Sequence, residues 1–424
     1  MKVEQALQFL PDLESVVPLR AALLASSEGS DRAAWTSAGA YLTVGKRNLS
    51  PEVVRQRMPQ LVRAVADHVA SVYHAYADAL DAQERGELGV AVASLLRAGR
   101  LEERAGRLHA ARGWFEVALR VAEGLQDRRP EVEALLAIGA ACVTIGAAAD
   151  GARAYQRGLA LAESEFDQEG AVAACEGLGR TAFERGEWAG AQAWLSRGLR
   201  LAEASGDPVR VGRLHRRLGS LADRQGDLVS AGDHLRRARE AVEPSGDARE
   251  MARILDAQGL VEARLGHPVV AIAAYREALA WTRRREPDPA LETRIRLHLA
   301  ELLLATDRAL EAEDEMRRAE QLAIGGNLTA RLVQIYTLMG AHRGRQGDET
   351  GFVFFEQAIT LCRALERSPA LEAEVCYEYG VFKHHLGQRD EARAYLERAR
   401  ELYEAVGGAA TLERVRAELE QLTA

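Results

Sequence analysis

The chain has 424 residues, of which 47% are hydrophobic and 28% are charged, and 55 basic against 63 acidic residues give a formal net charge of −8. This apolar fraction, with charges of both signs interspersed, excludes an intrinsically disordered chain. The mild acidity argues against a dedicated nucleic-acid binder, whose domain would be basic. Only 5% of the residues are aromatic, and Ala, Leu, Arg and Glu are abundant, which favours helices.

Residues 1–86 form a first segment that does not fit the pattern of the rest of the chain. Apolar spacing predicts helices near 3–10, 12–25 and 31–44, another that opens at Ser50 and Pro51, and a long helix from about 60 to 84. Up to residue 85 the segment has nine basic and ten acidic residues, so it lacks the positive charge of a DNA-binding domain. We interpret it as a divergent N-terminal helical segment.

Signals for secretion, membrane insertion and disulfide formation are missing. Glu4 stands where a signal peptide would carry its apolar run, and the longest apolar stretch, residues 135–149, is too short to span a bilayer. The four cysteines show no CxxC spacing, so we expect reduced thiols packed among apolar residues. These features predict a cytoplasmic protein without membrane insertion.

An internal period of 40 residues runs from residue 87 to residue 407, with one repeat of 41. The first column of small residues is Gly99, Gly139, Gly179, Gly219, Gly259, Ala300, Gly340 and Gly380. Seven residues later come Gly106, Gly146, Gly186, Gly226, Gly266, Asp307, Gly347 and Gly387. A third small column is followed, four residues on, by Phe115, Tyr155, Leu195, Leu235, Tyr275, Met316, Phe355 and Leu396. These columns predict eight repeats: 87–126, 127–166, 167–206, 207–246, 247–287, 288–327, 328–367 and 368–407.

Each column has a structural role within a pair of helices. A glycine inside the first helix costs about 1 kcal/mol relative to alanine, so we expect another helix to cross closely there. The second column ends the first helix, where glycine supplies the left-handed C′ conformation. The third column and the bulky residue four positions later share one face of the second helix.

A fourth column marks the start of each repeat with residues that cap helix N-termini. Its members are Asp127, Asp167, Asp207, Asp247, Asp288 and Ser368. Pro208, Pro289 and Pro369 follow directly and suit the N1 position. Beyond the repeats, Leu412, Val415, Leu419 and Leu422 give residues 408–424 one apolar face, which is typical of a solenoid's capping helix.

This pattern resembles the tetratricopeptide repeat, in the long-helix subtype found in bacterial signal-responsive regulators, kinesin light chains and spindle-orientation adaptors. One repeat carries the family pattern at Leu178, Gly179, Gly186, Ala191, Leu195 and Leu199, and another at Gly259, Gly266, Ala271, Tyr275, Ala278 and Leu279. The resemblance covers about three quarters of the chain. It implies an all-α fold, a right-handed α-solenoid of helix-turn-helix repeats whose first helices line a concave groove.

Several positions in these first helices point into that groove and are rich in arginine. The candidate binding residues are Arg180, Arg213, Arg216, Arg224, Arg253, Arg264 and Arg294. Acids are interspersed, namely Glu176, Glu184, Asp223, Asp256 and Glu301. Two interpretations stay open. Arginines partnered by nearby acids form a solvated surface, or they form a clamp for a carboxylate or an acidic peptide, since Arg binds carboxylates bidentately. The Lys and Asn clamp of the family is missing, so none is carried over.

Residue patterns of catalysis are also missing. The sequence contains no P-loop, dinucleotide fingerprint, HExxH or GxSxG motif, and adjacent His384 and His385 point about 100° apart on a helix. We therefore predict no enzyme, no cofactor and no metal. The predicted function is a scaffold or adaptor that binds a protein or peptide, with an acidic segment or a C-terminal carboxylate, in the concave groove. The alternative is a ligand- or peptide-responsive regulator of the bacterial type with residues 1–86 as its effector, and homo-oligomerisation is a third option.

Overall fold

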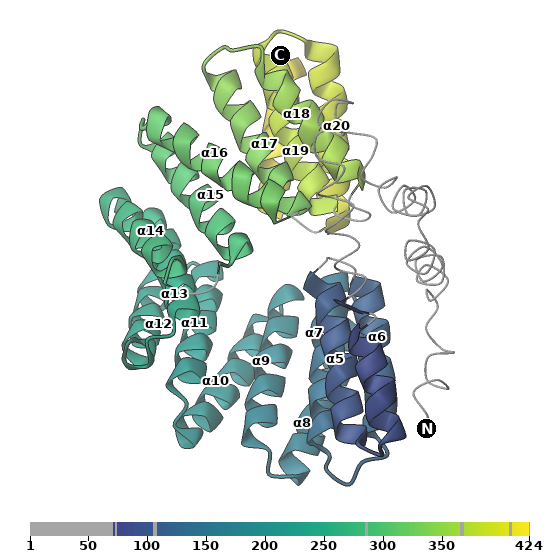
Figure 1. Ribbon diagram of the computed structural model, residues 1–424. Coiled ribbons are helices and arrows are strands. Elements are labelled where there is room, and N and C mark those ends of the chain that lie inside the picture. The colour runs from purple at the N-terminus through teal and green to yellow at the C-terminus, as the bar shows by residue number, and fades with distance from the viewer. Residues whose placement is uncertain are drawn as a thin grey trace, which may run out of the picture. The chain divides into compact units, whose positions relative to one another are not determined.

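The computed structural model describes residues 71–423 except 73, 105–107, 285–286, 327, 365–368 and 407–408. Across these residues the regular structure is helical throughout and contains no strand (Figure 1). The chain divides into two compact units between Gly246 and Asp247. We refer to residues 71–246 as the first unit and to residues 247–423 as the second unit. Most of the predicted N-terminal helices lie outside the described residues.

The first unit opens with a helix over 74–84 and continues as four antiparallel helix pairs. The pairs are α5 (Leu88–Arg104) with α6 (Leu108–Ala122), α7 (Arg129–Ile145) with α8 (Ala148–Ser164), α9 (Gln168–Glu184) with α10 (Trp188–Ser205), and α11 (Pro208–Arg224) with α12 (Leu228–Val242). A short 3₁₀ turn, η1 (Glu243–Ser245), follows the last helix.

The second unit repeats the same plan. Its pairs are α13 (Ala248–Arg264) with α14 (Pro268–Thr282), α15 (Pro289–Ala305) with α16 (Ala309–Gly325), α17 (Thr329–Arg345) with α18 (Gly351–Ala364), and α19 (Pro369–His385) with α20 (Arg389–Val406). A final helix, α21 (Ala409–Thr423), packs against α19 and α20. Its Val415 and Leu422 are buried there. The predicted all-α solenoid is confirmed.

Side-chain caps begin the first helices as the sequence predicts. The carboxylates of Asp167, Asp207, Asp247 and Asp288 each accept a hydrogen bond from a backbone N–H two or three residues later. Asp127 differs, because α7 starts at Arg129 and Asp127 therefore lies one residue before the N-cap position. It still accepts a hydrogen bond from the backbone N–H of Arg129 at 3.1 Å. Ser368 lies outside the described residues.

The turns within the pairs are left-handed, as predicted. Gly146, Gly186, Gly226, Gly266, Gly347 and Gly387 have φ between 71° and 92°. Asp307 takes the same place in the sixth repeat with φ 57°. At the turns between pairs, Gly206 and Gly246 are also left-handed, and Phe166 stands at the equivalent place with φ 54° although a side chain is strained there. The Phe166 side chain is 91% exposed.

Seven of the eight described pairs share one close contact, between a glycine of the first helix and a bulky side chain of the second. A Cβ atom built on Gly259 would lie 2.5 Å from Cε1 of Tyr275. The same overlap occurs between Gly139 and Tyr155 at 2.8 Å, and it recurs at Gly99, Gly179, Gly219, Gly340 and Gly380. The glycines are therefore required because the bulky side chain lies directly on their backbone. We call this contact the interlock.

Successive pairs pack through the second helix of one pair against the first helix of the next, and most neighbouring first helices within a unit also contact each other. In the first unit α7 contacts both α5 and α9, and in the second unit α15, α17 and α19 follow one another in contact. Within the described ranges, the second helices of successive pairs do not pack on each other in this way. The first helices therefore form the inner face of each unit.

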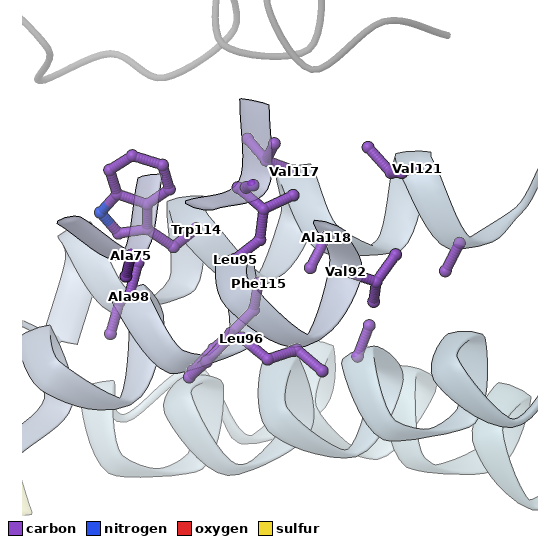
Figure 2. Packing of buried hydrophobic residues seen from close by; sticks show 14 of the residues in the cluster. Ala75, Val92, Leu95, Leu96, Ala98, Trp114, Phe115, Val117, Ala118 and Val121 are labelled. Carbon is purple, nitrogen blue, oxygen red and sulfur yellow. The ribbon is translucent and has the colours of Figure 1, made fainter. Parts of the chain in front are cut away.

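The segment before the first predicted repeat takes part in the core. Val72, Ala75, Ala79 and Ala82 are buried in one cluster with residues of α5 and α6. Figure 2 shows this cluster, with the Trp114 and Phe115 side chains of α6 lying among those of α5. The rings of Tyr76 and Trp114 lie 5.8 Å apart. The boundary at residue 86 stays a prediction, but the helix over 74–84 packs as the second helix of a preceding pair would.

All four cysteines are buried in this helix packing. Burial raises the pKa of the Cys175 and Cys362 thiols to about 11, so both stay protonated at neutral pH. Of the helices that the structure describes, none combines the length and the apolar character needed to cross a bilayer.

The interlock makes a direct prediction about stability. Gly259→Ala should lower the free energy of unfolding by about 1–3 kcal/mol, because the new methyl group overlaps the Tyr275 ring. Gly232→Ala is the matched control, since Gly232 lies within α12 with nothing near its Cβ position, and alanine there should stabilise by about 0.5–1 kcal/mol. Urea unfolding followed by circular dichroism measures both.

A double variant tests whether the overlap is the cause. Adding Tyr275→Met to Gly259→Ala reproduces the pair Ala300 and Met316 of the sixth repeat, both buried. It should recover part of the lost stability. Equal loss in the single and double variants would contradict the interlock.

Candidate binding surface on the first helices

The seven predicted arginines fall into two groups because the chain divides into two units. Arg180, Arg213, Arg216 and Arg224 belong to the first unit, and Arg253, Arg264 and Arg294 belong to the second. All seven lie on first helices. The structure brings three of them, Arg180, Arg213 and Arg216, into one cluster.

The cluster is built around the half-buried carboxylate of Glu176 on α9. Arg217 of α11 binds it through Nε at 2.5 Å, and Arg213, one turn earlier on α11, lies 3.7 Å away through Nη1. Arg216 also acts on Glu176 electrostatically. Burial alone would raise the pKa of the Glu176 carboxyl, but Arg217, Arg213 and Arg216 together hold this pKa below its ordinary value.

Arg180 adds a cation to this cluster that has only neutral partners. Its Nη2 donates to the carbonyl oxygen of Ala140 and to the hydroxyl of Tyr155, each at 3.3 Å. Its Nε is buried and has no hydrogen-bond partner among the described residues. Burial raises the pKa of the Tyr155 phenol, so the hydroxyl stays neutral and cannot balance the charge. We call Arg180, Arg213, Arg216, Arg217 and Glu176 the arginine cluster.

The remaining predicted residues are not part of this cluster. Arg224 is exposed near the end of α11, with its guanidinium 5.8 Å from the ring centre of Phe183. In the second unit, Arg253 lies 3.7 Å from Glu250, and Arg294 binds Asp256 through Nε at 3.0 Å. Arg264 is the exposed last residue of α13.

Arg217 is the member of the cluster that the sequence analysis missed. It stands two residues before Gly219, a position not assigned to the groove. The sequence offered no signal for it, because the residue at the equivalent position of α9 is Gly177, which has no side chain.

A metal site is not found in the described part of the chain. No three His, Cys, Asp or Glu side chains there come together in a way that could hold a metal ion. The surface therefore offers charge and hydrogen bonding on a rigid wall of helices.

Known proteins resemble this chain in fold only. No family model matches the sequence, and no curated protein matches it. The Rap conjugation gene regulator of plasmid pLS20, solved in complex with the Phr* peptide, is 15% identical with a TM-score of 0.51, over 85% of this chain and 100% of its own. A Rap protein complexed with competence and sporulation factor is 12% identical with a TM-score of 0.50, over 78% and 97%.

A thermophilic TPR protein of Thermus thermophilus is also similar, at 22% identity and a TM-score of 0.35 over 50% of this chain and 99% of its own. The fold is of the tetratricopeptide-repeat type. At identities this low, the likeness to the Rap structures concerns the arrangement of helices. The resemblance inferred from the repeat columns is confirmed at that level.

Behind the arginine cluster, α11 contacts α12 through a pair of histidines. Nδ1 of His215 and Nδ1 of His234 are joined by a hydrogen bond of 3.1 Å, which needs an acceptor nitrogen on one ring. Burial, the neighbouring His234 and Arg237 lower the pKa of His215 to about 4. Burial and Arg237 also lower the pKa of His234. Both rings are therefore neutral at neutral pH.

This pair predicts a loss of stability in acid. The folded pKa of His215 lies below its ordinary value of 6.5, so its contribution is complete above pH 6.5 and is lost as the pH falls toward 4. The loss amounts to about 3 kcal/mol between pH 7 and pH 4. His215→Leu, which copies buried Leu255 at the equivalent position, should remove that part of the pH dependence. Urea titrations at a series of pH values measure it, and an unchanged slope would contradict the assignment.

Proposed function

We propose that the protein is a non-catalytic scaffold that binds a peptide or a protein segment on the inner face of its first helices. The observation that carries this proposal is Arg180, a guanidinium with neutral partners and one buried nitrogen without a hydrogen bond to any described residue. A carboxylate is the group that a guanidinium binds best, through two parallel hydrogen bonds. The proposed partner therefore carries an acidic segment or a C-terminal carboxylate.

The surroundings of Arg180 support this choice of ligand. Glu176 is already bound by Arg217, so it is not available to Arg180. The arginine side chains come from α9 and α11, and an interlock packs each of these helices against the second helix of its own pair, which positions the side chains before a partner arrives. Ordering the site in advance reduces the entropy lost on binding. The two Rap structures above were solved with a bound peptide or factor, and we extend peptide binding to this chain as part of the proposal.

The other predicted arginines remain candidates for contacts along the same partner. Arg224 lies on the same first helix as Arg213 and Arg216, and Arg253, Arg264 and Arg294 lie on first helices of the second unit. A cytoplasmic location, where acidic protein segments are plentiful and thiols stay reduced, suits this role and is part of the same proposal.

Substitution of Arg180 tests the proposal. Arg180→Gln should weaken binding of the partner captured from a native lysate by at least about tenfold, because a charge-assisted hydrogen bond contributes about 1.5–3 kcal/mol. The glutamine leaves the ion pair of Glu176 and Arg217 intact, so the variant should keep its helix content. Surface plasmon resonance with the captured partner measures the change, and the wild-type affinity should fall with added salt.

Arg236→Gln is the matched control. Arg236 is an exposed residue of α12 that binds Asp233 at 2.9 Å, away from the inner face. Its loss should leave affinity unchanged. The proposed site would be contradicted if Arg180→Gln bound the partner as tightly as the wild type does. It would also be contradicted if Arg180→Gln and Arg236→Gln lost affinity equally.

A second candidate function is a regulator whose N-terminal segment is the effector. Its support is that one similar fold belongs to a conjugation gene regulator with a bound peptide. The predicted effector, residues 1–86, lies mostly outside the described residues, and its last part packs in the first core cluster. The effector under this proposal is therefore residues 1–70.

Truncation distinguishes the two candidates. A chain that starts at residue 71 keeps Val72, Ala75, Ala79 and Ala82, so it should unfold with the same midpoint as the full chain. Under the scaffold proposal its affinity for the captured partner is also unchanged. Under the regulator proposal the truncated chain still binds the peptide but no longer acts on the downstream target, which a pull-down of a second protein would detect.

A further inference from the structure

A polar pocket of about 250 Å³ lies on the inner face of the second unit and includes no residue of the arginine cluster. Its walls come from three successive first helices, α15, α17 and α19. Six charged side chains line it, three basic and three acidic: Arg294, Arg331, Arg345, Glu301, Glu374 and Glu378.

Only one of these three basic side chains is paired with a carboxylate of the described residues. Arg294 binds Asp256 of α13, which also forms a 2.7 Å contact with Nδ1 of His298. Arg331 donates to the amide oxygen of Gln334 at 2.7 Å, and Arg345 donates to the carbonyl oxygen of Ala341 at 3.3 Å. Neither forms an ion pair with any carboxylate in the described part of the chain.

Arg331 has no carboxylate at ion-pair distance to balance its charge. Its burial in the pocket wall and the nearby guanidinium of Arg294 lower the pKa of Arg331, and Asp256 offsets only part of this effect. A ligand carboxylate at Arg331 would supply the missing negative charge.

The three glutamates are in the opposite situation. None of Glu301, Glu374 and Glu378 forms an ion pair with a described residue. Desolvation by the pocket walls raises the pKa of all three carboxyls, although the side chains remain open to solvent. Glu301 and Glu378 raise the pKa of Glu374 further through repulsion. A cation between these three carboxylates would supply the positive charge that stabilises their ionised form.

The decisive feature is that both kinds of charge occupy one pocket without forming ion pairs with each other, although Arg345 and Arg414 act on Glu378 electrostatically from a greater distance. The side chains stand on three rigid helices, and the space between them is open. Two arginines and three glutamates remain without ion pairs to described residues, which leaves an excess of one negative charge. A ligand that fits must therefore carry a cationic group and an anionic group together.

We propose that this pocket binds a basic amino acid, arginine or lysine, through its side-chain cation and its α-carboxylate. The cation lies among Glu301, Glu374 and Glu378, and the carboxylate meets Arg331 or Arg345. The ligand is either the free amino acid or the C-terminal residue of a peptide, since both present the same two charges. The site rests on the second unit alone and goes beyond the proposed scaffold function, so either can fail without the other.

Calorimetric titration of the full chain tests the pocket with defined probes. L-arginine should bind, while agmatine, which lacks the carboxylate, and L-citrulline, which lacks the cation of the side chain, should each bind at least about tenfold more weakly. The tripeptide Ala-Ala-Arg with a free carboxylate distinguishes the sources. If it binds more tightly than L-arginine, the ligand is a peptide end, and if it binds more weakly, the ligand is the free amino acid.

Variants assign the binding to the pocket. Glu374→Gln and Arg345→Gln should each weaken L-arginine binding at least about tenfold. The exposed residues of α20 provide the controls Glu404→Gln and Arg393→Gln, which should leave it unchanged. Arg180→Gln should also leave it unchanged, because that residue belongs to the first unit. Circular dichroism confirms that each variant is folded.

Two results would overturn the inference. One is the lack of measurable binding of both L-arginine and Ala-Ala-Arg at concentrations on the order of 10 mM. The other is binding that survives unchanged in both Glu374→Gln and Arg345→Gln.

Discussion

The whole array depends on the contact between a glycine backbone and a bulky side chain within each pair of helices. At Gly259 the Tyr275 ring lies where a Cβ atom would otherwise be, and six other pairs repeat the arrangement. Such an approach fixes the distance and the crossing of the two helices at one point. Dispersion forces act over very short distances, so this close fit also adds favourable packing contacts in a chain with few aromatic residues.

Because the interlock uses the face between the two helices of a pair, the opposite face of each first helix is left to polar side chains. Arg180, Arg213 and Arg216 of the first unit can therefore project from a regular wall, as can Glu301, Glu374 and Glu378 of the second. Charges on such a wall cannot collapse onto each other freely, since their backbones are fixed. The same packing that gives stability thus leaves unbalanced charges on the inner face, and these are the groups that a ligand can use.

Much of the fold could be predicted because small residues, caps and turns are local signals that recur. The start of α7 shows the limit: Asp127 carries the capping signal, but Pro130 falls two residues later than proline does after Asp207, and the helix begins at Arg129 instead. The binding surface was less predictable. Arg217 and Arg331 depend on which neighbour each long side chain meets, and that is set by packing between repeats, which a periodic pattern within one repeat does not specify.

The sixth repeat shows what the interlock means for how such a chain can change over time. It carries Ala300 and Met316 where its neighbours carry glycine with an aromatic or leucine, and both residues are fully buried. Reaching this pair from glycine and tyrosine takes two substitutions. Enlarging the glycine first creates a clash, and shrinking the ring first leaves a void. Either order passes through a less stable protein, so each interlock resists drift one residue at a time and can be exchanged only as a pair.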